Sequence, residues 1–125
     1  MASPNEPVIG NLYSPKDQSD MHGGNQQQCA PMKEGRVLLL RVKRDHNPNA
    51  PYIVDWEDSN SPRVPLIEKQ TQQKPLPVYV RKRANEWKYR GRFRVTRVAT
   101  DDETLAERAK QANHKVSYAI YLERS

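Results

Sequence analysis

The chain has 125 residues, of which 35% are hydrophobic and ten are prolines. This is enough material for one domain with a small core and several irregular segments. The net charge of +6 favours nucleic acid, another polyanion or an acidic protein surface as the partner, although it also serves simply to keep a polar protein in solution.

A single cysteine, Cys29, excludes an intramolecular disulfide and any zinc site built on several thiolates. No apolar run is long enough for a membrane span or a signal peptide. We therefore expect an intracellular protein, nuclear or cytoplasmic, with no membrane among its partners.

The first 28 residues are rich in Asn, Gln, Ser, Pro and Gly and poor in branched apolar residues, a composition that stabilises chain order weakly. We expect residues 1–11 to form a flexible tail and residues 12–125 to form the single domain. The paired glycines Gly23 and Gly24 lie in a predicted loop, where they permit either close approach of a ligand or a simple bend.

Four segments follow in chain order. The apolar run Arg36–Val42 predicts a central strand buried on both faces. A loop dense in turn-forming residues separates it from a short strand, Tyr52–Trp56. The segment Pro65–Gln70 fits either a strand fragment or a single helical turn. The alternation of apolar residues in Lys115–Glu123 predicts the final strand.

Between these segments, Val78–Arg81 and Trp87–Val98 predict an antiparallel hairpin with a basic tip. Successive side chains of a strand point to opposite faces. The face expected to pack on the core carries Trp87, Tyr89, Gly91, Phe93 and Val95. The opposite face carries Lys88, Arg90, Arg92 and Arg94.

A helix is expected over residues 101–112, begun by a capping box between Thr100 and Glu103. The sum of the elements indicates an α+β, mainly β fold, with a small curled antiparallel or mixed sheet and one late helix.

Catalysis finds little support. The three histidines lie in separate segments without metal-ligand spacing, and no hydrolase nucleophile motif is present. We expect no enzymatic activity, no cofactor and no metal site.

The basic hairpin favours binding of nucleic acid, because a row of cations along one strand face can follow a phosphate backbone. The alternative is that the cations protect a sheet edge from pairing with another chain. The predicted nucleic-acid-binding residues are Arg81, Lys82, Arg83, Lys88, Arg90, Arg92 and Arg94.

Two aromatic residues, Tyr52 and Trp56, flank Asp55 between predicted loops. A carboxylate between two rings can accept hydrogen bonds from the exocyclic amine of an extruded base while the rings stack on it. The alternative is that Trp56 only anchors its loop.

Three segments, His22–Gln28, Tyr52–Trp56 and Trp87–Val95, together resemble the SRA-like domains of the PUA superfold that occur beside HNH nucleases. The resemblance spans about residues 12–98. It implies a curled β-barrel that binds DNA, and several domains of this family flip a modified cytosine into a pocket. Carried over by position, it implicates His22, Gly23, Gly24, Gln26, Asp55, Trp56, Tyr89 and Gly91.

The chain departs from that family in three ways. The glycine between the Asp and the Trp is missing at Asp55–Trp56, the family's Tyr-Thr-Gly segment is replaced by residues 64–74, and no HNH motif is present. These gaps affect the base pocket more than the fold.

The sequence thus predicts a nucleic-acid-binding module, with DNA favoured over RNA, that reads a modified or flipped base. The candidate base pocket consists of His22, Gly23, Gly24, Gln26, Tyr52, Asp55 and Trp56. The alternative is a protein-interaction domain, an inhibitor or adaptor, whose basic face binds an acidic protein.

Overall fold

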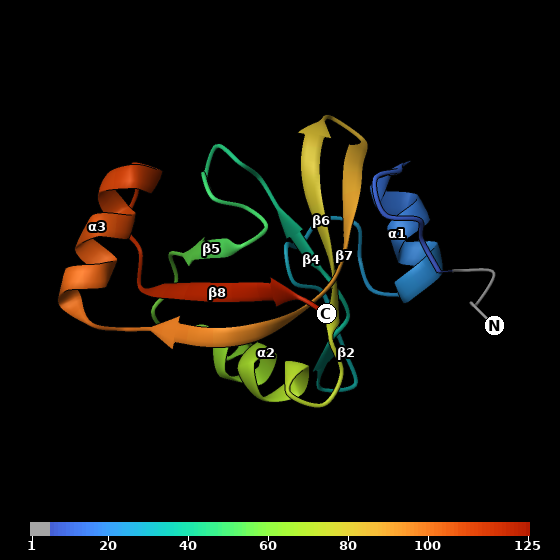
Figure 1. Cartoon of the computed structure of the whole chain (residues 1–125). Helices are drawn as coiled ribbons and strands as arrows, with labels where there is room; N and C mark the ends of the chain where they lie inside the picture. Colours follow the sequence, from blue (N-terminus) through green and yellow to red (C-terminus); the bar gives the residue numbers. More distant parts are fainter. Residues whose placement is uncertain (1–5) are drawn as a thin grey trace.

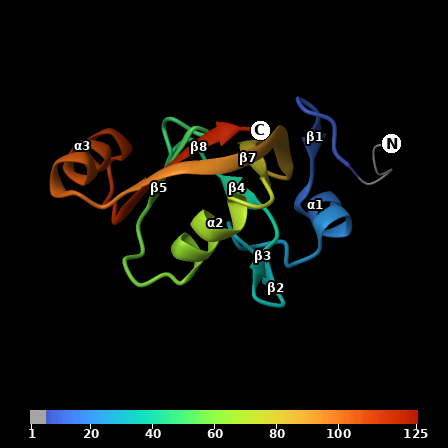
Figure 2. The same cartoon turned by 60° about the horizontal axis from the view of Figure 1, so that its bottom comes forward.

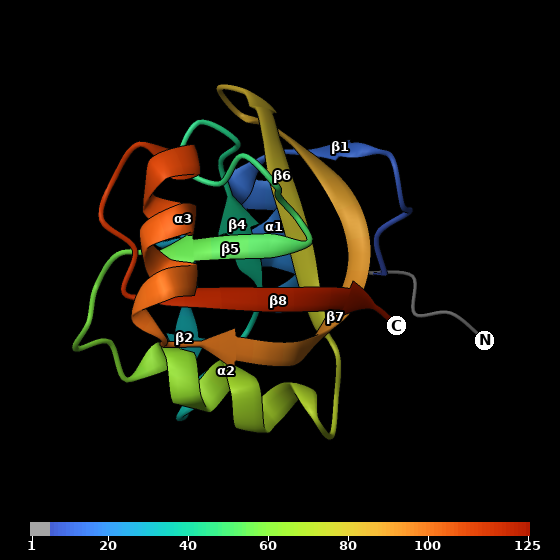
Figure 3. The same cartoon turned by 60° about the vertical axis from the view of Figure 1, so that its left-hand side comes forward.

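The computed structural model describes residues 6–125, which form a mainly β, α+β fold around one curled mixed sheet (Figures 1 and 3). The strands of this sheet are β1 (Leu12–Tyr13), β4 (Leu40–Val42), β5 (Ile53–Trp56), β6 (Leu76–Arg83), β7 (Glu86–Ala99) and β8 (Tyr118–Arg124). The helices are α1 (Pro15–His22), α2 (Arg63–Thr71) and α3 (Asp102–Ala112). A separate ribbon is formed by β2 (Met32–Lys33) and β3 (Arg36–Val37).

The sheet bends into a half-barrel in the order β4-β6-β7-β8-β5, with β4 parallel to β6 and the other neighbours antiparallel. Its longest strand, β7, belongs to both halves of the sheet. The first half of β7 pairs with β6, and the second half pairs with β8. The predicted hairpin is confirmed, and its tip extends beyond the rest of the sheet at the top of Figure 1.

A β-bulge at Arg90 divides β7 into two parts. Val78 lies opposite Gly91, whereas the next residue of β6, Tyr79, lies opposite Tyr89, so that Arg90 is an extra residue in β7. One extra residue exchanges the two faces of the strand beyond it. The alternation predicted for β7 therefore changes sides at this point.

The change of sides gives the molecule two apolar clusters. Phe93 and Val95 belong to the main core, which fills the half-barrel. Trp87 and Tyr89 belong to a second cluster on the other face, together with Tyr79. The predicted burial of all four residues is confirmed, but the prediction of a single apolar face is wrong.

Helix α2 closes one side of the half-barrel (Figure 2). Val64 and Ile67 bury their side chains in the main core. The backbone of Val95, at the point where β7 no longer pairs with β6, donates to Thr71 Oγ1 at 3.0 Å and accepts from Gln72 Nε2 at 3.0 Å. The helix thus supplies hydrogen-bond partners for the backbone of β7 where β6 no longer pairs with it.

Helix α1 packs near the second cluster with a polar rather than an apolar contact. Its only buried side chain is Gln18, whose Oε1 accepts from Nε of the buried Arg41 at 2.6 Å. A capping box between Ser14 and Asp17 fixes the start of the helix. Arg41 also donates to the backbone oxygens of Asn25 and Gln28, which holds the glycine-containing loop against the sheet.

Several sequence predictions need correction. The run Arg36–Val42 is not one central strand: it breaks into β3 and β4, and β4 lies at the end of the strand order. The segment that includes Pro65–Gln70 is helix α2, so residues 6–125 contain three helices rather than one late helix. Helix α3 is confirmed, but its N-cap is Asp101, which accepts from Thr104 N, and not Thr100.

The predicted tail, residues 1–11, is packed on β7 where the structure describes it. Gly10 N donates to Tyr89 O at 2.8 Å, and Tyr89 N donates to Asn11 O at 3.0 Å. Glu6 forms an ion pair with Arg92. Residues 1–5 of that prediction lie outside the described part of the chain.

Substitution of Gly91 by alanine is expected to destabilise the fold, because Gly91 has φ +109° and an added Cβ would lie 3.0 Å from Arg124 Cδ. We expect a loss of about 1–3 kcal/mol in the free energy of unfolding, measured by urea denaturation. Gly10→Ala is the matched control, since Gly10 also has a positive φ, +94°, but nothing lies within 4 Å of its Cβ position. Equal losses in the two variants would contradict a role for close packing at the bulge.

Candidate functional site

The cations of the hairpin fall into two groups according to their partners. Arg83 Nε lies 2.6 Å from Glu86 Oε2, and Arg92 forms two hydrogen bonds of 3.0 Å with Glu6. The other predicted cations, Arg81, Lys82, Lys88, Arg90 and Arg94, have no ion pair within residues 6–125.

Four of these unpaired cations surround one depression of about 260 Å³, which we call the basic depression. It is lined by Arg44, Val80, Arg81, Lys82, Lys88 and Arg90. No carboxylate is among these residues. Concentration of five positive charges around one concavity produces a local field that attracts anions.

The basic depression follows from the sheet topology. Because β4 runs parallel to β6 with Val42 opposite Val80, the chain leaving β4 at Lys43 and Arg44 continues beside Lys82. Lys88 of β7 lies opposite Val80 on the other side of β6. Cations from three chain segments thus meet at the end of the sheet from which the hairpin extends (Figure 1).

Sequence reasoning missed Arg44. The signal available was the Lys43-Arg44 pair directly after an apolar run, but its use required the parallel pairing of β4 with β6, which two distant segments determine together.

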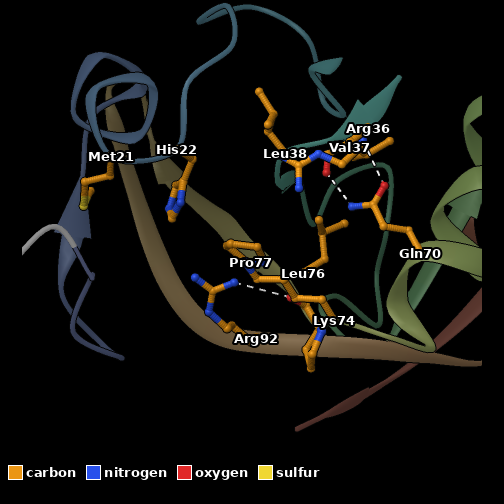
Figure 4. Close-up of a pocket in the computed structure, with 11 residues that line it drawn as sticks. Met21, His22, Arg36, Val37, Leu38, Gln70, Lys74, Leu76, Pro77 and Arg92 are labelled. Atoms are coloured by element: carbon orange, nitrogen blue, oxygen red, sulfur yellow. Dashed lines mark hydrogen bonds between the residues drawn. The ribbon is translucent and has the colours of Figure 1, made fainter. Parts of the chain in front are cut away.

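The remaining predicted cations lie elsewhere. Arg94 is exposed and lies opposite Glu123 of β8. Arg92 lines a different depression, beside His22, Arg36 and Lys74 (Figure 4). The predicted continuous stripe is therefore divided, and Arg81, Lys82, Lys88 and Arg90 are the members that the structure brings together.

The candidate base pocket is also divided. His22 lines the depression of Figure 4, Gln26 lines a cavity with Lys43 and Trp87, and Asp55 lines a third cavity with Trp56. The residues of this prediction thus do not surround one common cavity.

Each of its glycines and aromatics has a local contact. The added Cβ of Gly24 would lie 2.9 Å from both Leu38 and Pro31, so the loop approaches protein at this point. Trp56 packs partly against the main core, whereas Tyr52 is 50% exposed with its ring edge against Phe93. Gly23 ends helix α1 with φ +86°.

The carboxylate of Asp55 is fully engaged. Arg108 of α3 donates from Nε to Oδ1 at 2.8 Å and from Nη2 to Oδ2 at 2.9 Å, and both residues are buried. Asn47 accepts from the backbone N of Asp55 at 2.8 Å. The ion pair connects α3 to β5 and explains the buried aspartate without a ligand.

Removal of Arg108 is expected to destabilise the fold, because it leaves the Asp55 carboxylate, with 0% side-chain exposure, without its partner. For Arg108→Met we expect a loss of about 3–5 kcal/mol in the free energy of unfolding. The control is Arg97→Met, which removes a partner from the exposed Arg97–Asp101 pair and should cost about 0–1 kcal/mol. Chemical denaturation of both variants tests the difference, and a small loss in Arg108→Met would contradict a structural role for the pair.

His22 is a neutral imidazole in this fold. Its Nε2 lies 2.7 Å from the Tyr79 hydroxyl, and burial, with Arg92 as a second cause, lowers the pKa of His22 from 6.5 to about 4, while Glu6 acts in the opposite direction. Above pH 6.5 the ring is neutral in both the folded and the unfolded chain. Between pH 6.5 and about 4 the unfolded chain binds the additional proton, so acid favours unfolding.

The free energy of unfolding is therefore expected to fall as the pH falls from 6.5 to about 4. His22→Gln retains a polar side chain without a titrating ring and should show a shallower slope. Urea denaturation at a series of pH values measures both curves. Identical slopes would assign the acid sensitivity to other groups.

Among residues 6–125, no group of three or more His, Cys, Asp and Glu side chains is arranged to hold a metal ion. No helix in the same part of the chain is long and apolar enough to cross a membrane.

Comparisons with known proteins give no match: no family model, no curated protein and no solved structure is significantly similar to this chain. The site must therefore be interpreted from its own geometry.

Proposed function

We propose that the protein is a non-catalytic nucleic-acid-binding module that grips phosphates in the basic depression. The observation that carries this proposal is the convergence of five cations, without a carboxylate, around one concavity at the projecting end of the sheet. Cations that only protect a sheet edge from pairing with another chain would not need to converge around one concavity.

The charge of the depression supports an anionic partner. Its cations are held apart by strand and loop geometry rather than neutralised, and Arg44, Arg81, Lys82 and Lys88 are exposed. Mutual repulsion among them is a cost in the free protein that an anion removes. A polyphosphate backbone supplies several anions in series and releases counterions when it is bound.

The direction of the hairpin supports nucleic acid within the class of polyanions. The tip between β6 and β7 projects beyond the end of β4 at Val42, so the exposed Arg81 and Lys82 are accessible to a long ligand (Figures 1 and 3). The SRA-like resemblance favours DNA over RNA as the ligand. A PUA-like barrel and the reading of a modified or flipped base remain parts of this proposal that rest on the resemblance alone.

The test is fluorescence anisotropy with a labelled DNA duplex, repeated from low to physiological salt. The variant K82Q/K88Q/R90Q removes three cations of the depression. If each contacts one phosphate, the slope of log affinity against log salt should fall in magnitude by about 3 for B-form DNA. Affinity at low salt should fall in parallel.

The matched control is K33Q/K69Q/K110Q, which removes the same charge from exposed lysines that do not line the depression. It should leave the salt slope nearly unchanged. Equal effects of the two variants would reduce the interaction to net charge. Absent or salt-insensitive DNA and RNA binding would overturn the proposal and favour the alternative, an inhibitor or adaptor whose basic face binds an acidic protein.

A further inference from the structure

A second concavity, about 230 Å³ in volume, lies where α1, β3, the end of α2 and the start of β6 approach β7 (Figure 4). We call it the lateral depression. It takes no part in the proposed function, because it shares no lining residue with the basic depression. Its charged lining residues are Arg36, Lys74 and Arg92.

The lateral depression is built by fixed contacts. The side-chain amide of Gln70 in α2 binds both backbone polar groups of Val37. Its Oε1 accepts from Val37 N at 3.0 Å, and its Nε2 donates to Val37 O at 2.6 Å. This clamp fixes β3 and therefore the backbone that carries Arg36 (Figure 4). Arg92 donates to Pro75 O at 3.4 Å, which ties the opposite wall to the chain that enters β6.

The charges of the lateral depression are only partly balanced. Arg36 and Lys74 are exposed and form no ion pair or side-chain hydrogen bond among residues 6–125. Arg92 alone has an acidic partner, Glu6, which does not line the depression. No carboxylate is among the lining residues.

Glu6 shows how Arg92 receives an oxyanion. Both oxygens of its carboxylate accept from the guanidinium, Oε1 from Nε and Oε2 from Nη2, each at 3.0 Å. This two-bond geometry suits carboxylate and phosphate groups equally. The pair is partly exposed, with 31% of the Arg92 side chain and 35% of the Glu6 side chain accessible, so solvent and ions compete with it.

The rest of the wall is neutral. Leu76 and Pro77 supply apolar surface, and His22 carries no charge near pH 7 because its pKa is about 4. A ligand there would meet a lining with three cationic residues and no carboxylate. A compact anion of high charge density fits this pattern better than an extended one.

We propose that the lateral depression is a second anion-binding site that accepts a phosphate group, and that the Glu6 carboxylate competes with this phosphate for Arg92. Arg36 and Lys74 provide the unpaired positive charges. Arg92 provides a planar guanidinium group with two donors when its ion pair with Glu6 is broken. The phosphate belongs either to a small phosphorylated molecule or to nucleic acid. The inference does not rest on the proposed function, because its residues and its test are separate.

The test is isothermal titration calorimetry of the full chain with inorganic pyrophosphate, adenosine 5′-monophosphate and a short oligonucleotide that lacks terminal phosphates. The double variant R36Q/K74Q should weaken binding about tenfold or more in at least one arm, since two charge-assisted contacts are lost. E6Q should strengthen binding severalfold in the same arm, because Arg92 is released. Both substituted cations are exposed, so the fold is expected to persist, which circular dichroism verifies.

The matched control is K110Q/K115Q, which removes two exposed lysines that do not line the lateral depression. An effect of R36Q/K74Q on pyrophosphate or adenosine monophosphate assigns the site to a small phosphorylated molecule, and an effect confined to the oligonucleotide assigns it to nucleic acid. Equal losses in R36Q/K74Q and K110Q/K115Q, or no loss with any of the three ligands, overturn the site. Unchanged or weaker binding by E6Q overturns the competition. Loss of DNA binding in K82Q/K88Q/R90Q alone bears only on the basic depression.

Discussion

The extra residue Arg90 in β7 organises this molecule. Arg90 has no counterpart in β6. The apolar side chains of β7 that follow Gly91 therefore point into the half-barrel, whereas those that precede Arg90 point to the outer face. The strand therefore contributes side chains first to one apolar cluster and then to the other, and its cations line two different depressions. Both depressions depend on this division, since Lys88 and Arg90 line one and Arg92 lines the other.

The two clusters are closed by different means. The main core is mostly aliphatic and is closed by α2. The second cluster is closed by a polar network in which the buried Arg41 meets Gln18 and two backbone oxygens. Burial lowers the pKa of Arg41, which shows that its positive charge is held at a cost. This charge helps to keep His22 neutral.

Much of the fold was accessible from the sequence. The hairpin and the C-terminal strand each carry a strong local pattern, because their apolar residues recur with the period of a strand, whereas helix α3 was indicated mainly by its acidic first turn and the basic residue in its last turn. Helix α1 has no such pattern, since its one buried residue is a glutamine. Its start signals were the capping residues Ser14 and Asp17 and a proline, Pro15, at the first helical position. Helix α2 was obscured by Pro65, which lies in its first turn, where proline is tolerated.

The candidate site was only partly accessible. The basic residues of the hairpin were identified, but alternation alone cannot reveal a bulge, and so the division of the stripe was missed. Arg44 and Arg108 are distant in sequence from the residues they join, and only the pairing of β4 with β6 and the packing of α3 on β5 bring them there. The role of Asp55 as an internal partner of Arg108 was invisible for the same reason.

The position of β8 has a consequence for biosynthesis. This strand lies between β7 and β5, so the half-barrel is bridged by residues 118–124 near the end of the chain. The β6–β7 hairpin is local and is able to form as soon as residue 99 has emerged from the ribosome, whereas β5 must wait for a partner more than sixty residues downstream. Throughout that interval β5 and the second half of β7 lack the strand that pairs with them, which leaves unpaired strand edges exposed.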